Sequence, residues 1–303
     1  MKPLEARLKT LPKSKLSVEV AFGAIVLSGI IMGFSPVFVR EAEVGPFASA
    51  FWRVVFALPL LFLWAWYESR NDKHNPSVIS LPISGMLAGA FFSGDLIFWH
   101  LSILNTTMAN ATFTVCLSVV WVALLSNVVL GEKVSREFWL GLFLCLAGLG
   151  LLINSSLEID PSRLLGDVYG IITSFFLGAY MLAMRSARRH IDGGRLFLSS
   201  TIVTMLILLV AALIAGDTML ASTSRGWLSL ISLGVFTHAA GQGLVTLALG
   251  VLSAVFSSLV IFIEAVTAAF FGWLLFDEAM SWMQSLGGFM ILSGVWLARP
   301  KKG

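Results

Sequence analysis

The sequence has little charge and no signature of a soluble or nucleic-acid-binding protein. Charged residues make up 12% of its 303 positions, whereas soluble domains carry about 25%. Apolar residues make up 57%, which excludes an ordinary soluble domain. No basic run with interleaved aromatic residues occurs in a soluble context, so nucleic-acid binding has no support.

Groups with catalytic or metal-binding chemistry are also scarce. The chain has 2 cysteines, Cys116 and Cys145, and both lie inside apolar stretches. This placement indicates small buried side chains and says nothing about the redox compartment. No GxxxxGK[ST], HExxH or GxSxG motif occurs, and no Cys/His spacing suits a metal. We therefore expect no enzymatic activity, no cofactor and no metal.

What the sequence does contain is a series of ten apolar stretches. Each is close to the roughly 20 residues that a membrane-spanning helix requires. The predicted spans are 18–39, 46–67, 83–104, 107–130, 138–153, 166–187, 196–215, 227–249, 253–275 and 282–298. A basic tail (1–17) precedes them, a hydrophilic linker (154–165) divides them and a short tail (299–303) follows. Although Ala48-Ser49-Ala50 resembles a signal-peptide cleavage site, we expect the first span to remain uncleaved.

The distribution of lysine and arginine predicts the orientation. If the N-terminus is cytoplasmic, sixteen of these residues lie in cytoplasmic segments. Three lie in external loops, namely Arg40, Arg163 and Arg225. Because positive side chains favour the cytoplasmic side, both termini are predicted to be cytoplasmic.

The chain contains an internal repeat at an offset of 146 residues. Residues 131–150 and 277–296 are identical at seven of twenty ungapped positions. The identical pairs include Glu132 with Glu278, Gly141 with Gly287, and Gly148 with Gly294. Each copy ends a series of about five spans, so the second copy enters the membrane from the opposite side. Inverted repeats are typical of secondary transporters, which bind substrate between the halves. The predicted fold is all-α: ten transmembrane helices in two inverted five-helix repeats (18–153 and 166–298) around a central cavity.

Two charged residues are predicted to lie at matched depth in neighbouring spans. Arg53 and Asp95 are seven and nine residues from the outer ends of their spans, or about 10–14 Å below the external surface. Opposite charges at this depth predict an ion pair or a shared polar network. Such a network either locks the two helices together or acts in substrate binding or gating, and the sequence leaves both readings open.

Three further polar residues are predicted near the bilayer centre. Glu264 and His238 lie near the middle of their spans, and Gln242 follows His238 by one turn. A carboxylate in low-dielectric surroundings is a candidate proton carrier, a group that binds an amine, or a neutral hydrogen-bonding side chain. His100, close to the outer surface, is predicted to be interfacial.

Aromatic residues provide candidate walls for a binding site. Phe92, Asp95 and Trp99 share one helical face, because they are spaced i, i+3 and i+7. Trp121 and Tyr180 also lie deep in their spans. Aromatic walls around a carboxylate suit an amino acid, although each ring has the alternative role of filling the bundle.

Other residues are predicted to act in structure or gating. Pro36 is expected to kink the first helix, as a hinge or through packing alone. Glu132 lies in the turn LGEKVS (130–135) between the fourth and fifth spans. Close helix packing is predicted from the small-residue spacings Gly29/Gly33 and Gly85/Gly89.

The sequence resembles the drug/metabolite transporter superfamily, in particular its EamA-type members with ten helices. The resemblance covers residues 18–298. It rests on MGFSPVFVR (32–40), FWRVVFALPLL (51–61), LGEKVS (130–135), LGLFLCLAGLGLLI (140–153), FDEAMS (276–281) and LGGFMILSGVWLA (286–298). The halves differ, since Asp277 stands where the first half has Gly131 and the seventh span has no counterpart of Arg53.

The resemblance implies a bacterial inner-membrane exporter of amino acids or similar small metabolites. Phosphate-bearing substrates, which distant relatives exchange, would need a more basic cavity than one buried arginine offers. We expect small neutral or zwitterionic substrates, including aromatic amino acids, with protons as a candidate coupling ion and a monomer in the bilayer. The alternatives are export of drugs or toxic cations, and a membrane sensor without transport.

Overall fold

The structure is a computed structural model that describes residues 16–71, 77–79, 81–154, 160–276 and 281–299. The linker residues 155–159, Glu278 and most of both predicted tails lie outside these residues. Throughout the described part of the chain the secondary structure is helical, without strands.

The first repeat contains five helical spans, two of them broken. The first consists of α2 (Val18–Met32) and α3 (Ser35–Arg40), and the fourth of α6 (Met108–Cys116) and α7 (Ser118–Leu130). The other three spans are α4 (Pro46–Asn71), α5 (Ile83–Asn105) and α8 (Arg136–Leu152). Pro36 lies in the first turn of α3, so the predicted kink is a break, whereas α4 continues past Pro59.

The second repeat follows the same order. Its spans begin with α9 (Leu164–Arg188), preceded by the 3₁₀ turn η1 (Pro161–Arg163), and α10 (Gly193–Ala215). The next span combines α11 (Ser224–Ser232), the π-helix η2 (Leu233–Gln242) and α12 (Gly243–Ala248). The last two spans are α13 (Ala254–Ser257) with α14 (Val260–Phe276), and α15 (Trp282–Leu297).

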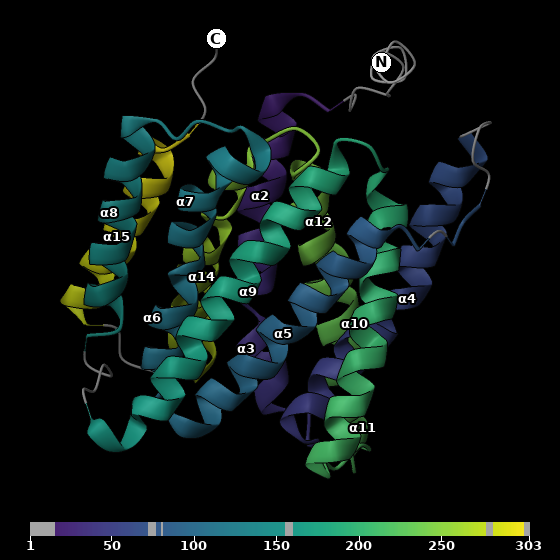
Figure 1. Cartoon of the computed structure of the whole chain (residues 1–303). Helices are drawn as coiled ribbons and strands as arrows, with labels where there is room; N and C mark the ends of the chain where they lie inside the picture. Colours follow the sequence, from purple (N-terminus) through teal and green to yellow (C-terminus); the bar gives the residue numbers. More distant parts are fainter. Residues whose placement is uncertain (1–15, 72–76, 80, 155–159, 277–280, 300–303) are drawn as a thin grey trace, which may run out of the picture.

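The ten predicted spans are all present as helical segments. Eight of them are long and apolar enough to cross a membrane. The other two, α8 and α15, are shorter, with 17 and 16 residues, and they lie side by side at one edge of the bundle (Figure 1). The fold is therefore an all-α membrane bundle, as the sequence predicts.

The two repeats interlock, because most large helix contacts cross from one repeat to the other. Helix α2 packs against η2, α12 and α14, and its counterpart α9 packs against α5, α6 and α7. Helix α4 packs against η2, and its counterpart α10 packs against α5. Exchange of the two repeats reproduces this pattern, which is expected of a two-fold pseudosymmetric bundle.

The glycines predicted to permit close packing do so across the repeats. A Cβ atom added at Gly29 or Gly33 would lie 2.6 Å from Ile263 or Thr267 of α14. One added at Gly89 would lie 2.5 Å from the carbonyl oxygen of Ser200 on α10. Lipid provides no hydrophobic drive for helix association, so such close van der Waals packing stabilises the bundle.

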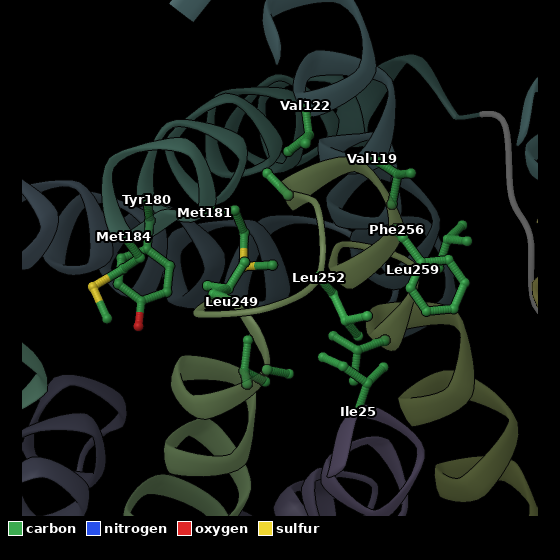
Figure 2. Close-up of a cluster of buried hydrophobic side chains, with 14 of the residues drawn as sticks. Ile25, Val119, Val122, Tyr180, Met181, Met184, Leu249, Leu252, Phe256 and Leu259 are labelled. Atoms are coloured by element: carbon green, nitrogen blue, oxygen red, sulfur yellow. The ribbon is translucent and has the colours of Figure 1, made fainter. Parts of the chain in front are cut away.

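Apolar side chains from both repeats form one core. Figure 2 shows part of it, with Ile25 of the first repeat near Leu252 of the second, and with Val119 of α7 near Phe256 of α13. Ile25, Leu249 and Leu259 are at most 1% exposed. Neither half could bury these side chains alone.

The two ends of the bundle differ in charge. The end at which α2 and α8 begin and α9 ends has Lys133, Arg185, Arg188, Arg189 and Arg299, and we call it the basic end. The other, at which α3 and α5 end, we call the opposite end. The sequence predicts that the basic end is cytoplasmic.

Candidate functional site

A cluster of three charged residues joins the repeats in the interior. Arg53 lies on α4, Asp95 on α5 and Glu264 on α14. Arg53 is attracted electrostatically by Glu264 and by Asp95, and the two carboxylates repel each other. Asp95 is 7% exposed, whereas Arg53 and Glu264 are half-buried. Glu264 thus acts electrostatically on both Arg53 and Asp95, and the ion pair or polar network expected of Arg53 and Asp95 stays a prediction.

Arg53 has unused hydrogen-bonding capacity. Its Nε atom is buried and has no hydrogen-bond partner among the described residues. A buried donor without a partner costs about 1–3 kcal/mol, and a guanidinium can hold a carboxylate through two parallel N–H donors. The unpaired Nε therefore makes Arg53 a candidate receptor for an anionic group.

A second polar group lies against the charged cluster. Gln242 donates from Nε2 to the Tyr180 hydroxyl at 3.0 Å, and the His238 Nε2 lies 3.2 Å from the Thr201 hydroxyl. Phe92 joins the two pairs, because its ring centroid is 4.8 Å from that of Tyr180 and 5.6 Å from that of His238. All five side chains are at most 5% exposed.

The two groups form one interior site. Tyr180 interacts electrostatically with Asp95 and with Arg53, and His238 interacts with Arg53. The structure thus brings together seven residues that the sequence singles out: Arg53, Phe92, Asp95, Tyr180, His238, Gln242 and Glu264. Five separate helical spans contribute to this site, and the spans come from both repeats.

The π-helix η2 positions His238 and Gln242. A π-helix of any length is rare and often occurs at functional sites, and this one covers ten residues. Glycines near its ends permit close contacts: a Cβ added at Gly234 would lie 2.8 Å from the Arg53 carbonyl oxygen. Gly241 accepts a hydrogen bond from Ser28 at 2.8 Å. The sequence does not predict this element, because helix type leaves no clear signature in hydropathy.

The remaining predicted aromatic residues have other neighbours. Trp121 donates from Nε1 to the Ser174 hydroxyl at 3.0 Å. Trp99 packs edge-on against His100, with ring centroids 4.9 Å apart. His100 itself is 2% exposed, and its Nδ1 lies 2.7 Å from the Leu96 carbonyl oxygen. His100 lies near the end of α5, where the rings of Trp99 and Phe47 pack against it, so it is buried within the bundle, and its place at the membrane interface stays a prediction.

Glu132 forms a separate polar cluster at the basic end. Its carboxylate accepts hydrogen bonds from Arg185 Nε at 2.8 Å, Arg189 Nη2 at 3.3 Å and the Ala254 backbone N–H at 2.9 Å. Arg185 also donates to the carbonyl oxygen of Leu249 at 2.7 Å. Glu132 thereby connects the turn after α7 to two helices of the other repeat, and neither arginine partner follows from the sequence alone.

The interior site is built from buried ionisable and polar side chains. Within the described ranges, no group of three or more His, Cys, Asp or Glu side chains is placed to hold a metal ion. Buried ionisable groups between transmembrane helices mark substrate or proton pathways. An inverted-repeat bundle with such groups at the interface of its halves defines a membrane transporter.

Comparisons with known proteins place the chain within this class. It belongs to the EamA-like transporter family, whose model matches residues 20–154 and 164–299. An uncharacterized transporter from Archaeoglobus fulgidus is 26% identical over 276 residues, or 91% of this chain and 94% of the relative. A pseudopaline exporter from Pseudomonas aeruginosa is 28% identical over 217 residues, or 69% of this chain and 72% of the relative.

A solved crystal structure shares the fold. It superposes with a TM-score of 0.81 at 15% identity and covers 93% of this chain and 97% of its own. The family match identifies the protein as a multi-pass integral membrane transporter with two repeats, as the internal repeat predicts.

Proposed function

We propose that this protein exports small neutral or zwitterionic metabolites by alternating access, without enzymatic chemistry. Amino acids, including aromatic ones, are the leading class. The unpaired Nε of Arg53, which Asp95 and Glu264 both attract electrostatically, carries the proposal. One cation and two carboxylates complement a molecule that bears both a carboxylate and an amine. The relative named as an exporter supports the direction of transport.

Each residue of the site has a proposed role. Arg53 binds the substrate carboxylate, and Asp95 binds the ammonium group. Phe92 and Tyr180 border the side-chain space, with Trp99 farther along α5 and Trp121 on α7. Buried charges are costly unless they are paired, so the substrate's own charges stabilise the occupied site.

Glu264 and His238 are the proposed proton-linked groups. Glu264 attracts Arg53 electrostatically, as Asp95 also does. A proton on Glu264 would release Arg53 to hold a substrate carboxylate, which couples proton and substrate binding. His238 and Gln242 provide further hydrogen bonds to polar substrate groups.

The proposed setting is a bacterial inner membrane with both termini cytoplasmic and a monomer as the transporting unit. The excess of arginine and lysine at the basic end supports this orientation. In this orientation Glu132 and its arginine partners form a cytoplasmic gate contact. Pro36 forms a hinge in the outer half of the first span.

The proposal is tested by release from proteoliposomes. Vesicles are loaded with a mixed pool of labelled amino acids, and release is followed with and without an imposed pH gradient. We expect protein-dependent release of a subset of the pool. Arg53→Gln should lower that release about 100-fold, because a loss of about 3 kcal/mol is typical when one partner of a buried charge cluster is removed. Glu264→Gln should abolish the effect of the pH gradient.

A matched control separates binding from general charge effects. Arg163→Gln also removes one arginine, but at an exposed turn where the side chain is 37% exposed, and it should leave release unchanged. Release of cationic dyes that persists in Arg53→Gln would favour drug or toxic-cation export instead. No release of any substrate by folded protein would favour a sensor and contradict the proposal.

A further inference from the structure

A cavity with a basic rim opens at the basic end, outside the interior site. It has a volume of about 250 Å³ and lies where the turn before α8, the start of α13 and the end of α15 meet. Its rim includes the cations Lys133 and Arg299, the hydroxyl groups of Ser135 and Ser253, and one carboxylate, Glu137. Both repeats contribute to it, and its rim has a net positive charge.

The floor of the cavity is apolar. Phe138, Phe256 and Ala298 line it and are at most 8% exposed. Trp139 of α8 and Trp296 of α15 are 41% and 58% exposed. Exposed tryptophans are typical of the level of the lipid headgroups. The cavity therefore offers cations and hydroxyl groups at headgroup level above an apolar floor.

The internal repeat shows that the fold does not require these cations. At the offset of 146, Lys133 corresponds to Ala279 and Arg299 corresponds to Ile153. The N-cap residues of the helices α13 and α6 do correspond, since Ser253 matches Thr107. The caps are shared by both ends of the molecule, whereas the basic rim is specific to one.

We propose that this cavity binds the phosphate headgroup of an anionic phospholipid. Lys133 and Arg299 pair with the phosphate, Ser135 and Ser253 hydrogen-bond its oxygens, and the glycerol and upper acyl chain lie on the apolar floor. Basic pockets between transmembrane helices are suited to such headgroups. The apolar floor and the exposed tryptophans favour a lipid over free phosphate. The bound lipid would bridge the two repeats beside the Glu132–Ala254 contact. The inference is independent of the transported substrate.

Native mass spectrometry of the purified full-length chain tests this site. The protein is mixed with equal amounts of phosphatidylglycerol and phosphatidylcholine, and the retained lipid is counted. We expect preferential retention of phosphatidylglycerol. Lys133→Gln/Arg299→Gln should weaken it about 30-fold, because each cation near an anionic headgroup is worth about fivefold in affinity.

The matched control removes two other cations from the same end. Arg70 stacks on Trp66 at 4.6 Å, much as Arg299 stacks on Trp296 at 3.6 Å, and Arg136 is exposed beside the cavity. Arg70→Gln/Arg136→Gln should retain phosphatidylglycerol as the wild type does. Equal losses in both double variants would overturn the proposal, since only bulk charge would then matter.

Two further outcomes decide the identity of the ligand. Excess inorganic phosphate should not displace the lipid, and complete displacement would assign the cavity to a free anion and overturn the lipid proposal. Lys133 and Arg299 are exposed, so the variants are expected to fold. The single variants Lys133→Gln and Arg299→Gln should each show about a fivefold loss, and no loss in either one would contradict the site.

Discussion

The helix pair α8 and α15 and the polar centre around Arg53 belong to the same two repeats, yet they differ in symmetry. A Cβ added at Gly141 would lie 2.5 Å from the Gly294 carbonyl oxygen, and one added at Gly148 would lie 2.6 Å from that of Gly287. Because Gly287 and Gly294 are the repeat counterparts of Gly141 and Gly148, each contact is the image of the other. Cys145 also lies against its own counterpart, Ile291, with a sulfur–oxygen distance of 3.5 Å.

The centre shows no such correspondence. At the same offset Arg53 corresponds to Ser199, Asp95 to Gly241 and Glu264 to Ser118. All three charges of the cluster therefore have small counterparts, and the charged side chains occur once each. The two repeats therefore share a symmetric packing of helices, whereas each charged side chain of the cluster occurs in one repeat only. Mutations at the symmetric positions should therefore lower the stability of the fold. Mutations at the asymmetric positions should lower the rate of transport.

The largest effect on stability is expected at the symmetric pair. Gly148→Ala places a Cβ against the backbone of α15, and overpacking of this kind costs about 1–3 kcal/mol. Gly150→Ala, on the same helix, meets nothing within 4 Å and should leave stability unchanged. Thermal unfolding in detergent measures both variants. Equal midpoints would show that the α8–α15 contact contributes nothing to stability.

A smaller effect should separate the two ends of the molecule. Glu132→Gln removes the charge that holds Arg185, where both side chains are at most 16% exposed, and should cost about 1–2 kcal/mol. At the opposite end, Glu41 pairs with Arg225 at 2.7 Å, but the arginine side chain is 76% exposed. Glu41→Gln should cost less than about 1 kcal/mol. Chemical unfolding measures the free energy of unfolding of both variants. A larger loss of stability in Glu41→Gln than in Glu132→Gln would contradict the expected difference between the two ends.

The smallest effect is a pH dependence at the opposite end. The Thr223 hydroxyl group, the backbone N–H groups of Thr223 and Ser222, and Arg225 lower the pKa of Glu43 below its ordinary value of 4.5. A lowered pKa in the folded state stabilises the fold above the unfolded value, and this contribution is lost as the pH falls through the folded pKa.

Thr223→Val tests this contribution because it removes the hydroxyl donor. The difference in thermal midpoint between wild type and variant should be largest near pH 7 and should become smaller below about pH 4.5. If the difference in thermal midpoint stays constant down to pH 3, protonation of Glu43 does not weaken its contact with Thr223.

Much of the frame could be predicted from the sequence, because hydropathy and the repeat determine it directly. The ten spans follow from runs of apolar residues, and the break at Pro36 follows from its missing N–H. The glycine spacings correctly indicate close packing. They cannot indicate the partner, and Gly29 and Gly33 pack against α14 of the other repeat.

The site could be predicted in part, because buried charges are conspicuous in an apolar sequence. Arg53, Asp95 and Glu264 follow from this rule, and Phe92 and Tyr180 follow from their depth. Depth alone places Glu264 with His238, whereas its electrostatic partner is Arg53. The depth of a residue gives only its position along the membrane normal. Which neighbouring helix its side chain faces depends on the rotation of its own helix and, for His238 and Gln242, on the π-helix η2.

The α8–α15 contact has a consequence for biogenesis. The glycine face of α8 finds its partner in α15, 146 residues later in the sequence. At about 5–20 residues per second, a ribosome needs roughly 7–30 s to supply that partner. During this interval α8 meets lipid or the insertion machinery along a face shaped for another helix. Quality control in the membrane can therefore act until α15 has been inserted, and a chain arrested before α15 should be degraded faster than one that includes α15 in a pulse-chase experiment.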